Sequence, residues 1–250
     1  MKKQFIFCVG VALSIVLTCS TVAMVFAAEN DPNTLSSEEK EDGFQLLFDG
    51  EKLSPEIWQS AIDGYPIENG AIVCRKGGNL FTKKEYANFV FRFEFLMPPG
   101  GNNGVGIRAE SPTKDAAYYG MECQILDNSS EKYKKLEPEQ YHGSIYKVAP
   151  AKRNPEKNDY QKPLGEWNTE EITANGSHIK VILNGETIVD VDIADIKVSG
   201  HPGLHRESGF VGFLGHGDPV QFRSVRIKEL PASAKAEKEK ETTEKKSVEN

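Results

Sequence analysis

The sequence predicts an all-β fold, a single domain built as an antiparallel two-sheet jelly-roll sandwich. No stretch within the domain shows a persuasive helical period. Turn-forming residues recur at roughly the 8 to 12 residue spacing of sandwiches, and the segments between them alternate apolar and polar residues. Two sheets that share one core each leave an outer face, and in jelly rolls that face is often concave enough to bind a ligand.

The stretch 118–127 (YYGMECQILD) has the most informative alternation. As a strand it separates a core face from a polar face: Met121, Cys123 and Ile125 on one, Gly120, Glu122 and Gln124 on the other. A carboxylate and an amide beside a glycine form a floor that could hold a polar ligand. An ordinary half-exposed strand gives the same pattern, so both interpretations stay open.

Three other stretches alternate in a similar way. Residues 87–97 place four phenylalanines on one face. Residues 104–109 place Arg108 beside two glycines, where it is either a surface guanidinium or a cationic donor over a cleared sheet face. Residues 141–148 predict a strand whose polar face carries His142, Ser144 and Tyr146.

Turn signals divide the rest of the domain into short strands. Asn69-Gly70 predicts a hairpin, and Asn175-Gly176 and Asn184-Gly185 bracket three strands between residues 166 and 193. The closing strand, 220–230, alternates imperfectly, as a bulge would cause. Residues 149–164 contain three prolines and many charges, which predicts a long loop of the kind that often carries function.

The N-terminal residues 1–28 have the features of a secretory signal peptide. Lys2 and Lys3 precede a long apolar run, and Val25 and Ala27 have the spacing that a signal peptidase accepts. The sequence therefore predicts export to the periplasm or the extracellular space, with cleavage near Ala27 or Ala28, which N-terminal sequencing would decide. The run also has about the 20 residues of a membrane span, so an uncleaved anchor stays open, and only then do we expect membrane contact.

Composition sets the other boundaries. Residues 29–42 are polar and acidic and predict a linker, residues 43–230 form the domain, and residues 231–250 form a Lys- and Glu-rich tail that is disordered or a fraying helix.

Removal of the signal leaves Cys74 and Cys123, either as one disulfide or as two buried thiols. The net charge of -7 argues against nucleic acid as a partner. The sequence does not indicate an oligomeric state.

Seven motifs in order resemble the 3-keto-disaccharide hydrolase domain family: FQLLFDG, NNGVGIRAE, YGMECQILD, HGSIY, GEWN, ILNGE and GFVGFLGHGDPVQFRSVRI. The resemblance covers about residues 43–230 and implies a concanavalin A-like jelly roll. Two positions depart from the family pattern, since Leu214 stands where glutamine is common and Ser224 where asparagine is usual. A missing amide could change the substrate preference or mark a member without activity.

The resemblance implies cleavage of glycosides already oxidised at C3 of the sugar. A C3 ketone makes the C2 hydrogen acidic, so a base can remove that proton, the C1 substituent can leave by elimination, and water can add later. Such an enzyme needs a base near C2, a group that stabilises the enolate oxygen, and an acid for the leaving group. The expected partner is a glycoside or oligosaccharide substrate.

Four residues are candidates for catalysis: His142, Glu122, His216 and Arg108. We expect His142 to act as the base, because a neutral imidazole suits removal of a C2 proton, and Arg108 to stabilise the enolate. Glu122 fits a base, a metal ligand or a hydrogen-bonding partner. Each residue also has a structural interpretation, since a single histidine in such a pattern is more often structural than catalytic.

Five residues are candidates for substrate binding: Gln124, Asp127, Tyr146, Trp167 and Asn168. Asp127 fits a turn cap equally well, and Trp167 fits the core equally well. His201 and His205 lie in a loop where a role at the rim is open, and His178 fits the surface. No cofactor is indicated; a divalent metal is compatible with the carboxylates and histidines, although no tight ligand spacing is present.

Two other classes of function stay open. A non-catalytic, lectin-like carbohydrate-binding module fits the same sandwich, and so does a purely structural surface domain that binds no sugar. Two histidines near a carboxylate and an arginine favour the enzyme, because a lectin needs only hydrogen bonds and aromatic stacking.

Overall fold

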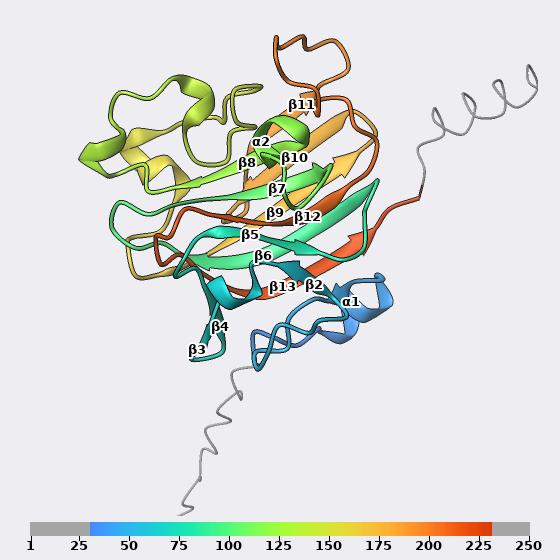
Figure 1. Ribbon diagram of the computed structural model, residues 1–250. Coiled ribbons are helices and arrows are strands. Elements are labelled where there is room, and N and C mark those ends of the chain that lie inside the picture. Colours follow the sequence, from blue (N-terminus) through green and yellow to red (C-terminus); the bar gives the residue numbers. More distant parts are fainter. Residues whose placement is uncertain (1–30, 232–250) are drawn as a thin grey trace, which may run out of the picture. The chain divides into compact units, whose positions relative to one another are not determined.

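A computed structural model describes residues 31–231 and confirms the all-β prediction. Two antiparallel sheets face each other (Figure 1). Sheet A has the order β11-β10-β9-β6-β13-β4-β3, with β1 also paired to β13, and sheet B has the order β2-β5-β12-β7-β8. None of the helices in residues 31–231 is long and apolar enough to cross a membrane.

The strands of sheet A include the longest runs of alternating residues in the domain. Their bounds are β1 Gln45–Leu46, β3 Ile67–Glu68, β4 Ala71–Val73, β6 Phe89–Leu96, β9 Trp167–Asn175, β10 His178–Leu183, β11 Glu186–Asp192 and β13 Gln221–Glu229. The Asn69-Gly70 and Asn184-Gly185 turns have the positive φ angles that two-residue hairpins require. The predicted bulge in β13 lies between Arg223 and Arg226.

The strands of sheet B are β2 Trp58–Ser60, β5 Gly78–Thr82, β7 Asn102–Ala109, β8 Met121–Leu126 and β12 Phe210–Gly215. Strand β8 begins later than predicted, because Tyr118 and Tyr119 belong to the short helix α2 (Ala116–Tyr119), which Asp115 caps. Residues 141–148 do not form the predicted strand. They contact β8 through an isolated bridge between Cys123 and Ile145.

The core fills the space between the sheets. The four phenylalanines of β6 are fully buried, as predicted, and Phe213 of β12 stacks on Phe222 of β13 with ring centroids 3.8 Å apart. Cys74 and Cys123 are buried free thiols. The long loop predicted for residues 149–164 contains the 3-10 helix η4 (Pro155–Tyr160); three other 3-10 turns are η1 (Ile62–Gly64), η2 (Glu131–Tyr133) and η3 (Pro138–Gln140).

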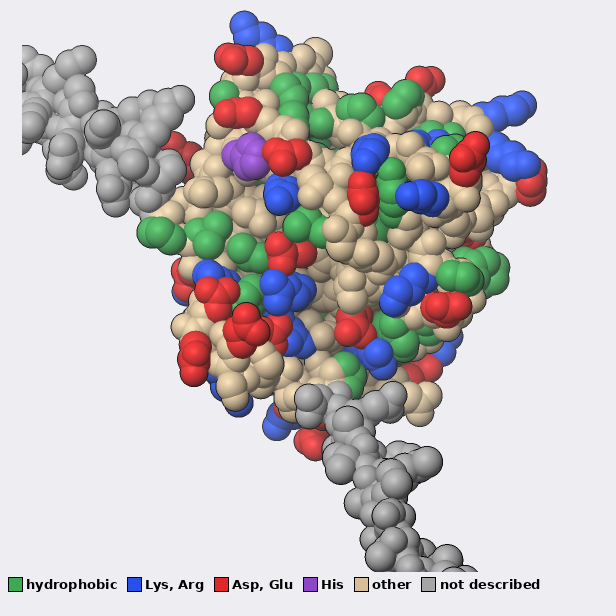
Figure 2. Space-filling view, turned by 180° about the vertical axis from the view of Figure 1, so that it is seen from behind, with side chains coloured by type: hydrophobic (Ala, Val, Ile, Leu, Met, Phe, Trp, Pro, Cys, Tyr) green, Lys and Arg blue, Asp and Glu red, His purple; other side chains and the backbone are tan. Residues whose placement is uncertain are grey.

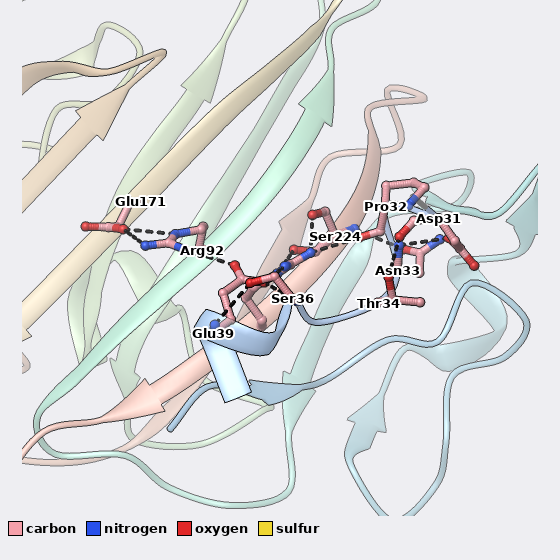
Figure 3. Close-up of polar contacts among 10 residues, drawn as sticks. Asp31, Pro32, Asn33, Thr34, Ser36, Glu39, Arg92, Glu171 and Ser224 are labelled. Carbon is pink, nitrogen blue, oxygen red and sulfur yellow. Dashed lines mark hydrogen bonds and ion pairs between the residues drawn. The ribbon is translucent and has the colours of Figure 1, made fainter. Parts of the chain in front are cut away.

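Part of the predicted linker is folded against the sandwich. Residues 31–42 contain helix α1 (Ser37–Glu41), and Asn33 is buried, with Oδ1 accepting from the backbone N–H of Ser224 at 2.9 Å. Figure 3 shows α1 over β6 and β13, where Glu39 bridges Arg92 and Arg226. The predicted signal peptide and nearly all of the C-terminal tail lie outside the described residues.

Candidate functional site

The centre of the candidate site is Glu122 on the outer face of sheet B. Its neighbours across β7 are glycines, because the register pairs Gly106 with Glu122 and Gly104 with Gln124. A Cβ atom at position 104 would lie 2.0 Å from Oε1 of Glu122, so only glycine fits beneath the carboxyl group. Phe81 and Leu214 cover Gly106 from the other side, where a Cβ atom would lie 2.9 and 3.0 Å from their side chains.

The carboxyl group of Glu122 is in an environment that disfavours its charge. The residue is only 6% exposed, and burial raises its pKa to about 8, with a further contribution from the negative charge of Asp115. Neither Oε1 of Glu122 nor Oε1 of Gln124 has a hydrogen-bond partner among the described residues. Glu122 is therefore mostly a neutral acid at pH 7, able to donate a proton to a polar ligand.

Two tyrosines are connected to Glu122, one through the backbone and one through Lys147. Although residues 141–148 are not a strand, the backbone N–H of Tyr146 donates to the carbonyl of Glu122 at 2.8 Å, which fixes Tyr146 beside it. The next residue, Lys147, has a φ of +56° and places Nζ 3.0 Å from the hydroxyl of Tyr118. Nζ of Lys147 also lies over both tyrosine rings. We call Glu122, Gln124, Tyr118 and Tyr146 the outer-face site.

His142 does not share this face, and the prediction that it does is wrong. Its ring lies between the sheets, where Nδ1 accepts from the backbone N–H of Leu126 at 3.1 Å and Nε2 lies 3.0 Å from Oε2 of Glu170. The two side chains are 1% and 0% exposed. The alternation argument fails because Gly143, with a φ of +78°, turns the chain directly after His142.

Glu170 is a residue that sequence reasoning missed. It lies on β9 on the same face as the buried Ile172 and Ala174, and Sγ of Cys123 lies 3.6 Å from its Oε1. The signal was present in the sequence, because period-two alternation along β9 places a carboxylate on the core face. A buried carboxylate needs a partner, and Nε2 of His142 is the group placed to supply it, 3.0 Å from Oε2 of Glu170 but without hydrogen-bond geometry.

Arg108 and His216 are also away from Glu122. Arg108 has a φ of +50°, and its guanidinium donates to the carbonyls of Ala87, Gly176 and Arg206, so it clamps three chain segments together. Burial lowers the pKa of Arg108 to about 10. His216 is exposed in the turn after β12. Of the four predicted catalytic residues, the structure places only Glu122 in the outer-face site.

The structure also places some of the predicted substrate-binding residues beside Glu122 and the others elsewhere. Gln124 and Tyr146 lie beside Glu122. Asp127 caps a turn, accepting from the backbone N–H groups of Gly100 and Ser129. Trp167 lies under the guanidinium of Arg223 on sheet A, 4.1 Å from it, and Asn168 is buried between Lys162 and Asn184.

Two further features bear on where chemistry can occur. Within residues 31–231 no group of three or more His, Cys, Asp or Glu side chains is arranged to hold a metal ion. A groove of about 300 Å³ lies beside the Leu96–Gln221 pair of sheet A, lined by Leu96, Met97, Pro98, Pro99, Leu164, Gly165, Pro219 and Gln221. None of these side chains is ionisable, so the groove itself supplies no acid or base.

A family model described as the 3-keto-alpha-glucoside-1,2-lyase-like domain matches residues 43–228. The chain belongs to this family. A curated relative, the 3-keto-disaccharide hydrolase of Bacteroides thetaiotaomicron, is 26% identical over 236 residues, which cover 76% of this chain and 79% of the relative.

Two solved structures from Parabacteroides distasonis, both provisionally assigned as glycosyl hydrolases, share the fold. The first is 26% identical with a TM-score of 0.68 and covers 80% of this chain and 99% of its own. The second is 29% identical with a TM-score of 0.60 and covers 75% and 99%. A carbohydrate-active function of the glycoside hydrolase kind is therefore supported for this member of the 3-keto-alpha-glucoside-1,2-lyase-like family.

The structure gives the two departures from the family pattern distinct positions. Leu214 packs with Phe81 over Gly106, which is the residue paired with Glu122. An apolar side chain therefore stands where we expected an amide. Ser224 lies in the β13 bulge with a φ of +58°, and its hydroxyl contacts the guanidinium of Arg226. Only Leu214 therefore bears on the outer-face site of this family member.

Proposed function

We propose that the protein cleaves glycosides oxidised at C3 and that the reaction takes place at the outer-face site. The observation that carries the proposal is Glu122, a carboxylic acid that is buried over Gly104 and kept neutral by that burial, in a member of this family. The two tyrosines of the outer-face site give a sugar ring aromatic surface and hydroxyl groups to contact.

The chemistry needs one acid and one base. With a ketone at C3, loss of the C2 proton gives an enolate, and expulsion of the C1 substituent then forms a C1–C2 double bond. In this scheme Glu122 donates its proton to the leaving oxygen, so that an alcohol departs rather than an alkoxide. Water adds to the double bond afterwards, which completes hydrolysis.

We also propose that the protein meets its substrate outside the cytoplasm. The support is the basic start, apolar run and small-residue cleavage pattern of residues 1–28. A secreted protein whose N-terminus follows Ala27 or Ala28 is the expected result, whereas an intact Met1 in a membrane fraction would favour the anchor.

A substrate panel tests the reaction. Wild type, Glu122→Gln and the exposed control Glu56→Gln are incubated with 3-keto-glucosides and with the corresponding plain glucosides, with and without a chelator. We expect turnover of the 3-keto substrates alone, a loss of about 100-fold or more in Glu122→Gln, and no change in the control. Wild type that leaves every 3-keto substrate intact would overturn the proposal.

One observation favours a second function, a carbohydrate-binding module. Leu214 places an apolar side chain where a polar contact to substrate was expected, which suits a surface that holds sugar without reacting. The same panel separates the two functions. Sugar binding without turnover of any 3-keto substrate would assign the protein to the module, and neither binding nor turnover would assign it to a structural domain.

A further inference from the structure

His201 differs from the other histidines of the chain. It is 7% exposed, and neither ring nitrogen makes a well-formed hydrogen bond within residues 31–231, although backbone groups of His201 itself and of Ala117 lie near enough to act on its pKa. His142 accepts a hydrogen bond from the backbone N–H of Leu126 and lies 3.0 Å from Glu170, and His178 is exposed with Nε2 2.6 Å from Oδ1 of Asp190. His205 and His216 are exposed. A buried imidazole without partners is costly, so it calls for a ligand or a function.

The segment that carries His201 packs against the outer-face site. The ring of His201 lies 5.9 Å from the ring of Tyr118, and the backbone N–H of Gly203 donates to the carbonyl of Tyr118 at 2.8 Å. A Cβ atom at position 203 would lie 2.2 Å from the backbone nitrogen of Gly120, so two glycines allow the segment to cross directly over the start of β8. That crossing places the segment of His201 against Gly120, which lies two residues before Glu122 in the sequence.

The same aspartate influences both groups. Asp115, the cap of α2, acts electrostatically on Glu122 and on His201. One carboxylate therefore acts on both the imidazole and the carboxylic acid, and the ring of Tyr118 lies beside the imidazole. Together they provide what the reaction requires, a base and an acid, and neither the ring nitrogens of His201 nor Oε1 of Glu122 make a well-formed hydrogen bond within residues 31–231.

We propose that His201 is the base that removes the C2 proton, acting together with Glu122 as the acid. This inference rests on the proposed function and deepens it. One ring nitrogen of His201 takes the proton, and the C–H electron pair forms the enolate across C2 and C3. The C3 carbonyl then re-forms, the C1–C2 double bond appears, and the C1–O bond breaks as Glu122 protonates the departing oxygen.

Hydration returns both groups to their starting states. Water adds its oxygen to C1, its proton goes to the Glu122 carboxylate, and the imidazolium of His201 gives its proton back to C2. Water is the only co-reactant, and no oxidant or reductant is consumed.

The electrostatics agree with this division of roles. Burial lowers the pKa of His201 below its ordinary value, and His205 lowers it further, while Asp115 and nearby backbone groups oppose the shift. Burial and Asp115 raise the pKa of Glu122 to about 8. At pH 7 the imidazole is therefore neutral and the carboxyl protonated, which are the states that a base and an acid need.

Access to these groups requires movement. The ring nitrogens of His201 and Oε1 of Glu122 are shielded from solvent in the structure. In this proposal the segment around Gly203 has to separate from Gly120 to admit a sugar, and its return would exclude water from the reacting atoms.

The test follows C2–H bond cleavage by NMR in deuterated water. The 3-keto-glucoside is incubated with wild type, His201→Gln, Glu122→Gln and the control His178→Gln, which changes an exposed histidine of β10. We expect His201→Gln to slow total C2–H cleavage by about 100-fold or more, with substrate binding changed little. We expect Glu122→Gln to keep C2 deuterium exchange and lose release of the alcohol, and the control to match wild type.

A pH profile makes the test independent of how the variants fold. The wild-type kcat/KM should fall on the acid side with an apparent pKa below 6.5, and His201→Gln should lack that limb. Normal C2–H cleavage in His201→Gln, or a wild-type acid limb at or above 6.5, would overturn the assignment. If wild type and Glu122→Gln behave as proposed while His201→Gln is normal, only the role of His201 fails. Wild type inert toward 3-keto-glucosides would overturn the function itself.

Discussion

Glu122 is a residue whose burial opposes stability. Its pKa is about 8 in the folded protein and near 4.5 as a free side chain, so the folded state binds more protons than the unfolded state between these values. The free energy of unfolding therefore falls as pH rises from about 4.5 to 8. Such a cost is typical of groups kept for chemistry.

This linkage gives a prediction for Glu122→Gln. Because the amide cannot ionise, the stability of the variant relative to wild type should be greater at pH 8.5 than at pH 5 by about 4 kcal/mol. Urea unfolding at the two pH values measures the difference, with Glu56→Gln as the control. A stability difference that is the same at both pH values would show that Glu122 titrates normally.

At the residue scale, the sequence predicted the faces of regular strands and failed where the chain turns. Glu122 and Gln124 were assigned to the outer face from alternation along β8, and the structure places them there. His142 was assigned by the same rule to a segment that is not a strand, so the rule did not apply. His201 has no periodic context at all, and only its burial without partners distinguishes it.

Helix α1 shows how an element can be missed when its stability comes from distant partners. The sequence around it is polar and acidic, which predicted a linker. In the structure Ser36 and Glu39 form a capping box, and Glu39 also pairs with Arg92 and Arg226 from strands far along the chain (Figure 3). These arginines gave no local signal, because their contacts depend on how the strands are ordered in sheet A.

The ion pairs of α1 predict an acid-sensitive attachment. Although burial raises it, the pKa of Glu39 is held below its ordinary value by the backbone N–H of Ser36 and the guanidinium of Arg226. The stability from this group is therefore present above about pH 4.5 and is lost as pH falls through the lowered pKa. Glu39→Gln should cost about 1 kcal/mol at pH 7 and little at pH 3.

Hydrogen exchange of the α1 amides measures this effect directly. The matched control is Glu38→Gln, an exposed neighbour in the same helix for which no ion pair is present in the described structure. Faster exchange in Glu39→Gln alone at pH 7 is expected. Equal exchange in both variants would mean that the pairs with Arg92 and Arg226 do not hold the helix.

At the scale of the whole domain, the two outer faces have different characters. Sheet A carries paired charges, among them Arg92 with Glu171 and Arg223 with Glu94. Figure 2, which shows the molecule from behind the view of Figure 1, has acidic and basic side chains interleaved with small hydrophobic areas. Sheet B instead carries unpaired buried polar groups over glycines. This difference is why we propose sheet B as the ligand-binding face.

The most direct test of the central claim is a crystal structure of Glu122→Gln with an unreacted 3-keto-glucoside. We predict that the sugar ring lies against the side chain at position 122, with C2 facing His201, the glycosidic oxygen facing the substituted side chain, and Tyr118 or Tyr146 against the ring. A sugar bound instead in the groove beside Leu96 and Gln221, with the outer-face site unoccupied, would contradict the claim that the reaction takes place on sheet B.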